Sequence, residues 1–119
     1  MYLSEILSSF ICGEPDFDPQ VRYLAKRSIA DTVGAMLAGS RTDVVKRLLP
    51  VYNASGSCTL VGLKDTVSAN NAAFLNGISG HELELDDTSS SNLGHPTVAV
   101  LPSVLAVGEE QAASGEDVL

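Results

Sequence analysis

The segment from Ala69 to Leu83, ANNAAFLNGISGHEL, limits most strongly how this chain can fold. Small residues recur along it at near-helical spacing, namely Ala69, Ala72, Ala73, Gly77 and Gly80. A glycine inside a helix costs about 1 kcal/mol relative to alanine, so two of them require compensation from tight packing. The segment therefore predicts a central helix that begins after Ser68 and packs between other helices. This packing would fix the position of its C-terminal end.

Three helices are predicted before this segment. Apolar residues at helical spacing predict a short amphipathic helix over 2–12. Asp18 followed by Pro19 is a typical helix start, and the pattern then continues over 19–38 with Gly39 as a stop. Thr42 is placed to cap a third helix over 43–52, which Pro50 would end or kink.

The long helix over 19–38 should bury one stripe of side chains, consisting of Val21, Leu24, Ala25, Ile29, Val33, Met36 and Leu37. Asp31 lies near this stripe. It is either a buried functional carboxylate or a residue that bonds a nearby backbone or hydroxyl group, and we favour the structural interpretation.

The remaining elements are also mostly helical. Residues 58–62 contain at most one short extended segment, centred on Thr59 to Val61. His95 and Pro96 begin a helix that runs to about Ala113, and Ser114 caps a last helix that the sequence enters for one turn. The predicted fold class is all-α, and a chain that ends just after a helix start, as 1–119 does, looks truncated.

Composition limits the core and the partners. Aromatic residues make up 5% of the chain and tryptophan is absent, so Ala, Val, Leu and Ile must form the core. The formal net charge of −8 disfavours nucleic acids and anionic membranes, which bind basic surfaces. Neither a secretory signal nor a spanning segment is recognisable, so we expect a soluble, cytoplasmic protein in which Cys12 and Cys58 are free thiols.

Titratable residues are concentrated in HELELDDTSSSNLGHP, from His81 to Pro96. If the central helix persists to about Leu85, His81 and Glu84 share one face. Carboxylates at the negative end of a helix are unfavourable, and strained charge is most common at functional sites. A histidine at the next helix start, His95, suits a proton acceptor or a hydrogen-bond donor.

Two other interpretations of this stretch remain open. The first is a solvated acidic turn between two helices, which is the more common situation in an arbitrary protein. The second is a metal site formed by His81, Glu84, Asp87 and His95, which are suitable ligand types for a divalent ion. Their spacing matches no specific metal motif, so we predict that no metal is bound.

A succession of motifs resembles the N-terminal region of the MmgE/PrpD family, which includes 2-methylcitrate dehydratase, cis-aconitate decarboxylase and iminodisuccinate epimerase. These motifs are RSIADTVGAMLAGS, TLVGL, AAFLNG, HELELDDT, HP before an apolar helix, and ASGED. Their order and spacing match from about Val21 to Leu119. The resemblance implies the N-terminal part of the family's helical domain, without its α+β lid domain.

The same resemblance implies a cofactor-independent lyase or isomerase that acts on small di- or tricarboxylic acids. Carried over by position, the family's catalytic pattern falls on Glu84, Thr88 and His95, and many members have Asp in place of Glu84. Supporting positions that help to bind substrate are His81, Asp86 and Asp87. The reaction would begin with proton removal beside a carboxylate, as in a 2-methylcitrate dehydratase.

A polycarboxylate substrate needs cationic partners, and this stretch offers almost none. The resemblance implies that lysine and further histidines come from the rest of the enzyme chain, so the 119 residues alone should be inactive. It also implies a homodimer. The alternative, from a different functional class, is a small acidic helical interaction module without catalysis, whose Ala/Gly faces bind a partner.

Overall fold

The structure is a computed structural model that describes residues 2–13 and 16–119. Its helices are α1 (Leu3–Ile11), α2 (Pro19–Gly39), α3 (Asp43–Leu48), α4 (Ala69–His81), α5 (Pro96–Glu110) and α6 (Gly115–Val118). The strands β1 (Cys58–Thr59) and β2 (Thr66–Val67) form a small antiparallel hairpin. The prediction of an all-α fold with a short extended segment is confirmed.

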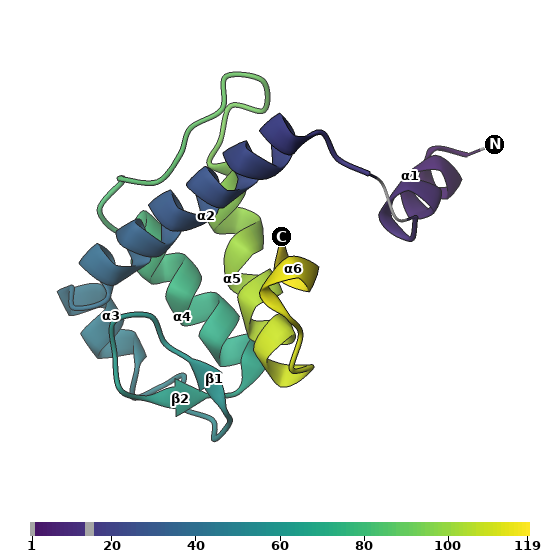
Figure 1. The fold of residues 1–119 in the computed structure, drawn as a ribbon. Coiled ribbons are helices and arrows are strands. Elements are labelled where there is room, and N and C mark those ends of the chain that lie inside the picture. Colours follow the sequence, from purple (N-terminus) through teal and green to yellow (C-terminus); the bar gives the residue numbers. More distant parts are fainter. Residues whose placement is uncertain (1, 14–15) are drawn as a thin grey trace.

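Helix α4 is central, as its small residues predicted. Helix α2 lies across α4 and α5 (Figure 1). A Cβ atom on Gly39 of α2 would lie 2.0 Å from the carbonyl oxygen of Ser79 in α4. A Cβ atom on Gly80 would lie 2.7 Å from Cγ2 of Val98 in α5. Glycine at both positions therefore allows the three helices to approach closely.

The main core is small and aliphatic. It consists of Cys58, Leu60, Val67, Ala72, Leu75 and Ala106, which come from the hairpin, α4 and α5. The partly buried ring of Tyr52 packs against this cluster. The core composition agrees with the prediction made from the low aromatic content.

The predicted buried stripe of α2 is only partly correct. Val21, Leu24 and Leu37 are exposed, whereas the buried residues of the helix are Thr32, Ala35, Met36 and Gly39. The C-terminal half of α2 makes the close approach to α4, and small residues rather than large apolar ones permit that approach. Asp31 is exposed, so it is not a buried carboxylate.

The extended segment near 58–62 was predicted without a partner strand, and in the structure it has one. Cys58 pairs with Val67 and Thr59 with Thr66. Asn76 of α4 supports the segment from the other side: its Oδ1 accepts a hydrogen bond from Val61 N, and its Nδ2 donates one to Thr59 O, both at 2.9 Å. A helix side chain thus supplies the hydrogen bonds that a further strand would otherwise make.

Asn76→Ala should lower the free energy of unfolding by about 2–4 kcal/mol, because it leaves two backbone groups without partners at about 1–3 kcal/mol each. Urea unfolding followed by circular dichroism measures this change. Asn70→Ala is the matched control, since Asn70 is exposed on the same helix. Equal stability of the two variants would show that the buried amide is not important for the hairpin.

Helix α1 stands apart from the other helices (Figure 1), and it contributes no buried residue. Its apolar side chains are therefore open to solvent, including Leu3, Leu7 and Phe10. Among the described residues, no helix combines the length and the apolar character needed to cross a membrane.

Both cysteines are free, as predicted: Cys12 is exposed and Cys58 is buried. Burial raises the pKa of the Cys58 thiol, and the nearby charges of Glu109 and Glu110 raise it further. The Cys58 thiol also donates to the carbonyl oxygen of Ala106 at 3.4 Å. Cys58 is thus a protonated core residue rather than a reactive group.

Candidate active site

The C-terminal end of α4 fixes the first residue of the site. The helix ends at His81, and Glu84 N donates to His81 O at 2.9 Å in a turn. Glu84 adopts a left-handed backbone conformation with φ of 52°. The condition considered from the sequence, a helix that persists to about Leu85, is therefore not met, and Glu84 does not share a helical face with His81.

The loop after Asp87 folds back and places His95 close to His81. Ser89 and Gly94 form an isolated antiparallel bridge, in which Ser89 N donates to Gly94 O at 2.9 Å. His95 then occupies the N-cap position of α5. The bridge thus brings the start of α5 beside the end of α4.

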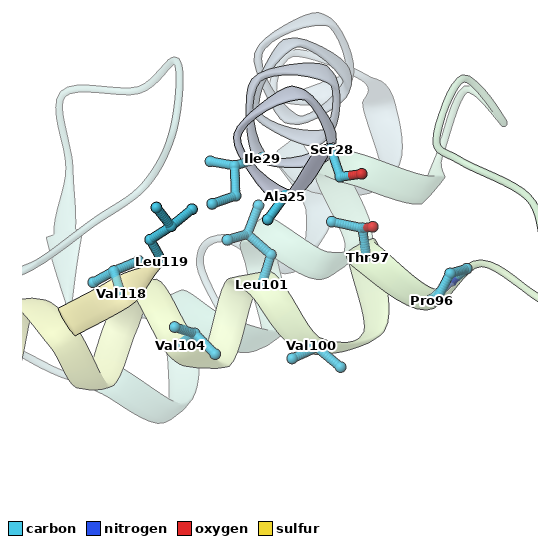
Figure 2. A pocket seen from close by; sticks show the side chains of 10 residues that line it. All are labelled: Ala25, Ser28, Ile29, Pro96, Thr97, Val100, Leu101, Val104, Val118 and Leu119. Carbon is cyan, nitrogen blue, oxygen red and sulfur yellow. The ribbon is translucent and has the colours of Figure 1, made fainter. Parts of the chain in front are cut away.

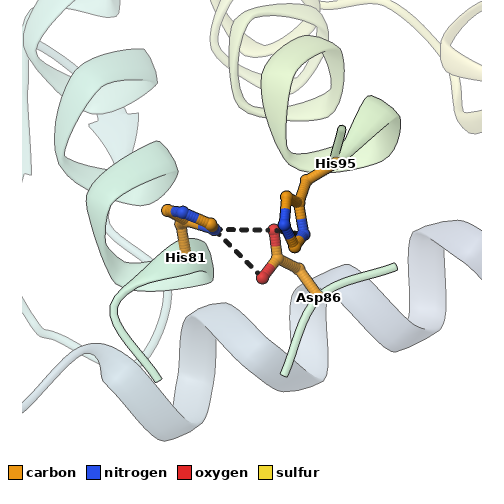
Figure 3. Close-up of side chains that lie close together, drawn as sticks. All are labelled: His81, Asp86 and His95. Atoms are coloured by element: carbon orange, nitrogen blue, oxygen red, sulfur yellow. Dashed lines mark hydrogen bonds and ion pairs between the residues drawn. The ribbon is translucent and has the colours of Figure 1, made fainter. Parts of the chain in front are cut away.

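His81, Asp86 and His95 meet at this point (Figure 3). The Nδ1 atom of His81 lies 3.2 Å from Asp86 Oδ1 and 3.1 Å from Asp86 Oδ2. The Nδ1 atom of His95 lies 3.2 Å from the same Oδ2. The side chain of Asp86 is 0% exposed, whereas those of His81 and His95 are 51% and 32% exposed.

The two imidazole rings are also in contact, with centroids 4.7 Å apart and an angle of 66° between their planes. A carboxylate only accepts hydrogen bonds, so Asp86 favours a proton on Nδ1 of each ring. The Nε2 atoms then carry the free lone pairs. The arrangement can therefore present an imidazole base or hydrogen-bond acceptor to a ligand.

This site is distinct from an apolar groove between α2 and α5 (Figure 2). The groove has a volume of about 350 Å³ and ends at Val118 and Leu119. Ser28 and Thr97 supply its only side-chain hydroxyls, and none of its lining residues is titratable. It offers no group for acid–base chemistry.

The profile described as MmgE/PrpD N-terminal domain matches residues 6–119. The chain belongs to the MmgE/PrpD family. The cis-aconitate decarboxylase of Homo sapiens is 36% identical over 89 residues, which are 71% of this chain and 18% of the human protein. The Mus musculus enzyme is 35% identical over the same shares.

A cis-aconitate decarboxylase-like protein, oryM of Aspergillus oryzae, is 28% identical over 100 residues, covering 82% of this chain and 21% of that protein. The chain thus spans about a fifth of the length of these curated relatives. No solved structure matches the chain significantly.

Three residues that the MmgE/PrpD resemblance had marked lie outside the histidine cluster. Glu84 and Thr88 are exposed on the loop, and their catalytic roles stay predictions. The metal-ligand set considered from the sequence contained Glu84 and Asp87 beside the two histidines. The structure instead groups Asp86 with both histidines. Asp86, predicted to be only a supporting residue, is the buried centre of the cluster.

Asp87 faces the start of α5 instead. Its Oδ1 accepts from Thr97 N at 3.1 Å, and its Oδ2 accepts from the hydroxyl of Thr97 at 2.5 Å. His95 occupies the N-cap position but makes no capping hydrogen bond, so Asp87 takes over this function from outside the helix. A negative charge at a helix N-terminus is favourable.

Asp87→Ala should lower the free energy of unfolding by about 0.5–2 kcal/mol, the usual cost of losing a helix cap. Urea unfolding measures the loss. Glu82→Ala removes an exposed carboxylate from the same loop and serves as the control. An Asp87 variant as stable as the Glu82 variant would contradict the capping role.

Proposed function

We propose that this chain forms the N-terminal part of the active site of a cofactor-independent lyase or isomerase for small di- or tricarboxylic acids. Family membership supports the enzyme class. The observation that carries the proposal is the buried carboxylate of Asp86, which lies within 3.2 Å of Nδ1 of both His81 and His95. Fully buried carboxylates beside partly exposed imidazoles are typical of sites that move protons.

His95 is the proton-transferring residue in this proposal. Its Nε2 atom removes a proton beside a substrate carboxylate or, when the ring is protonated, donates a hydrogen bond to that carboxylate. In dehydration, as of 2-methylcitrate, the hydroxyl group then leaves with a returned proton as water, and in epimerisation the proton returns on the other face. In decarboxylation CO2 leaves first, and the carbanion that remains takes a proton from His95 in its protonated form. Two matched relatives are decarboxylases, which favours CO2 loss and cis-aconitate as the first substrate to test.

The other residues of the stretch act around His95. Thr88 donates a hydrogen bond to the substrate. Glu84 orients the substrate or shuttles a proton. His81 contributes a second imidazole beside the first. The contacts of Asp86 and Asp87 support positioning roles: Asp86 holds the imidazoles and Asp87 holds the start of α5.

The cationic half of the pocket must come from elsewhere in the enzyme. Among the described residues, Asp86 forms its ion pairs with the two imidazoles, and no lysine or arginine is paired with this carboxylate. A substrate with two or three carboxylates would be repelled by such a site alone. We therefore propose that the isolated 119-residue chain does not turn over substrate.

A chimera tests both statements. The matched region of human cis-aconitate decarboxylase is replaced by the corresponding residues of this chain, and cis-aconitate decarboxylation is followed by NMR. The chimera should be active, His95→Gln should lower kcat by about 10²–10⁴-fold, and the isolated chain should be inactive. A fully active His95→Gln chimera, or turnover by the isolated chain, would refute the proposal.

A second candidate is a non-catalytic interaction module, and the exposed apolar face of α1 favours it. We propose instead that this face packs within the complete enzyme, which we expect to be a homodimer. The double variant Leu7→Ser, Phe10→Ser distinguishes the two candidates. If the variant chimera loses its activity and no longer forms dimers in sedimentation, α1 packs within the enzyme. Unchanged activity together with loss of a heterologous partner supports the module.

A further inference from the structure

We propose that His81, Asp86 and His95 form a binding site for a divalent transition-metal ion of the zinc class. This inference goes beyond the proposed cofactor-independent activity and does not depend on it. Metal binding can be measured on the chain without any turnover.

The distances between the three donors fit such an ion. Asp86 Oδ2 lies 3.1 Å from His81 Nδ1 and 3.2 Å from His95 Nδ1. One donor atom from each of the three residues lies within 4.8 Å of those of the other two. Bonds of about 2.0–2.2 Å to a tetrahedral zinc ion place neighbouring ligands roughly 3.2–3.5 Å apart. Small rotations of the two imidazoles would therefore bring all three donors to one ion.

Hydrogen bonding alone leaves one of these donors unsatisfied. His81 Nδ1 forms hydrogen bonds with both oxygens of Asp86. His95 Nδ1 is also near the carboxylate, but it is buried and forms no hydrogen bond of acceptable geometry with the described residues. Coordination would engage the carboxylate and both Nδ1 lone pairs at once, and it would give the buried Nδ1 atom of His95 a partner.

The chemistry and access of the site agree with this assignment. Two imidazoles and one carboxylate are a common ligand set for zinc, with a fourth position left for water. His81 is half exposed, which gives an ion a route from solvent. The chain has a formal net charge of −8, so cations concentrate around it.

Metal binding would change the tautomer of both histidines. Beside Asp86 alone, each neutral imidazole carries its proton on Nδ1. A bound ion takes the Nδ1 lone pair, so the proton of the neutral ring lies on Nε2 instead. An ion bound here would therefore block the Nε2 lone pair that the proposed catalysis uses, and the metal-bound and base forms of His95 exclude each other.

Isothermal titration of Zn²⁺ into the 119-residue chain, with Cys12→Ser to remove the exposed thiol, tests the site. We expect saturable binding of one ion per chain and a shift of both rings to the Nε2–H tautomer in ¹⁵N NMR. His81→Gln and Asp86→Asn should each weaken binding by at least about tenfold, since even an outer-shell change has this effect. Glu82→Gln, an exposed carboxylate beside the cluster, should bind as the parent does.

Absence of saturable binding would overturn the proposal, as would equal affinity in the parent and the His81→Gln variant. Because His81 is half exposed, its substitution should leave the fold intact even if Asp86→Asn unfolds the chain. Circular dichroism of each variant verifies this. Failure of metal binding leaves the chimera experiment unaffected, so the two proposals fail separately.

Discussion

Gly39→Ala is expected to lower the free energy of unfolding by about 1–3 kcal/mol or more. The new methyl group would lie 2.0 Å from the carbonyl oxygen of Ser79, which is backbone and cannot rotate away. Helices α2 and α4 would have to separate, and α4 carries His81 at its end. Urea unfolding of the parent chain and the variant measures the loss.

Gly34→Ala is the matched control on the same helix. A Cβ atom at Gly34 meets nothing within 4 Å, so alanine should stabilise the helix by about 0.5–1 kcal/mol. Opposite signs for the two substitutions would locate the close crossing at Gly39. A Gly39 variant as stable as the Gly34 variant would mean that α2 and α4 do not cross as described.

Asp86→Asn is expected to lower kcat of the chimera by about 10²-fold or more, because it disturbs the residue that positions the proton-transferring histidine. Asparagine preserves the shape of the side chain, but it is neutral and its amide donates as well as accepts. The two Nδ1 atoms then lose the anionic group that lies within 3.2 Å of both. Steady-state kinetics with cis-aconitate, with kcat and KM determined separately, measures the effect.

Ser90→Ala, on the exposed turn of the same loop, is the control for that experiment. It should leave kcat and KM unchanged, because its side chain is exposed and the structure shows no hydrogen bond between it and the described residues. An Asp86→Asn chimera with the kcat of the Ser90 variant would show that the carboxylate does not position a catalytic group.

Features that depend on local chemistry could be predicted from the sequence. The start of α2 follows from Asp18, whose Oδ1 accepts from Gln20 N at 2.7 Å. The start of α6 follows from Ser114, whose hydroxyl accepts from Asp117 N while Asp117 accepts in return. These hydrogen bonds lower the pKa of Asp117. Each cap involves residues within three positions, so the sequence pattern contains all the partners.

Features that depend on tertiary contacts could not be predicted in this way. Val21 and Leu24 look like core residues on a helical wheel, yet the crossing with α4 uses Ala35 and Gly39. The left-handed turn at Glu84 involves no glycine, so the residue types at this position do not predict the end of α4. The sequence pointed to the correct stretch, but the loop closure decides which of its carboxylates becomes buried.

The same limit applies to the two histidines. His81 and His95 are separated by a loop rich in Ser, Asn and Gly, which predicts a turn. It does not predict the bridge between Ser89 and Gly94 that sets the return of the chain. Neither the spacing of the histidines nor that of the carboxylates identifies Asp86 as their common partner. Its position five residues after His81 matches no helical or strand period, and only the fold brings the three side chains together.

The tautomers of His81 and His95 test most directly whether Asp86 organises the site. Long-range ¹H–¹⁵N NMR of the metal-free chain, at an alkaline pH where the imidazoles are neutral, distinguishes the two nitrogens of each ring. We expect protons on Nδ1 of both histidines in the parent chain, and loss of this preference in Asp86→Asn. Protons on Nε2 in the parent chain, or the same tautomers in both proteins, would contradict the proposed role of the buried carboxylate.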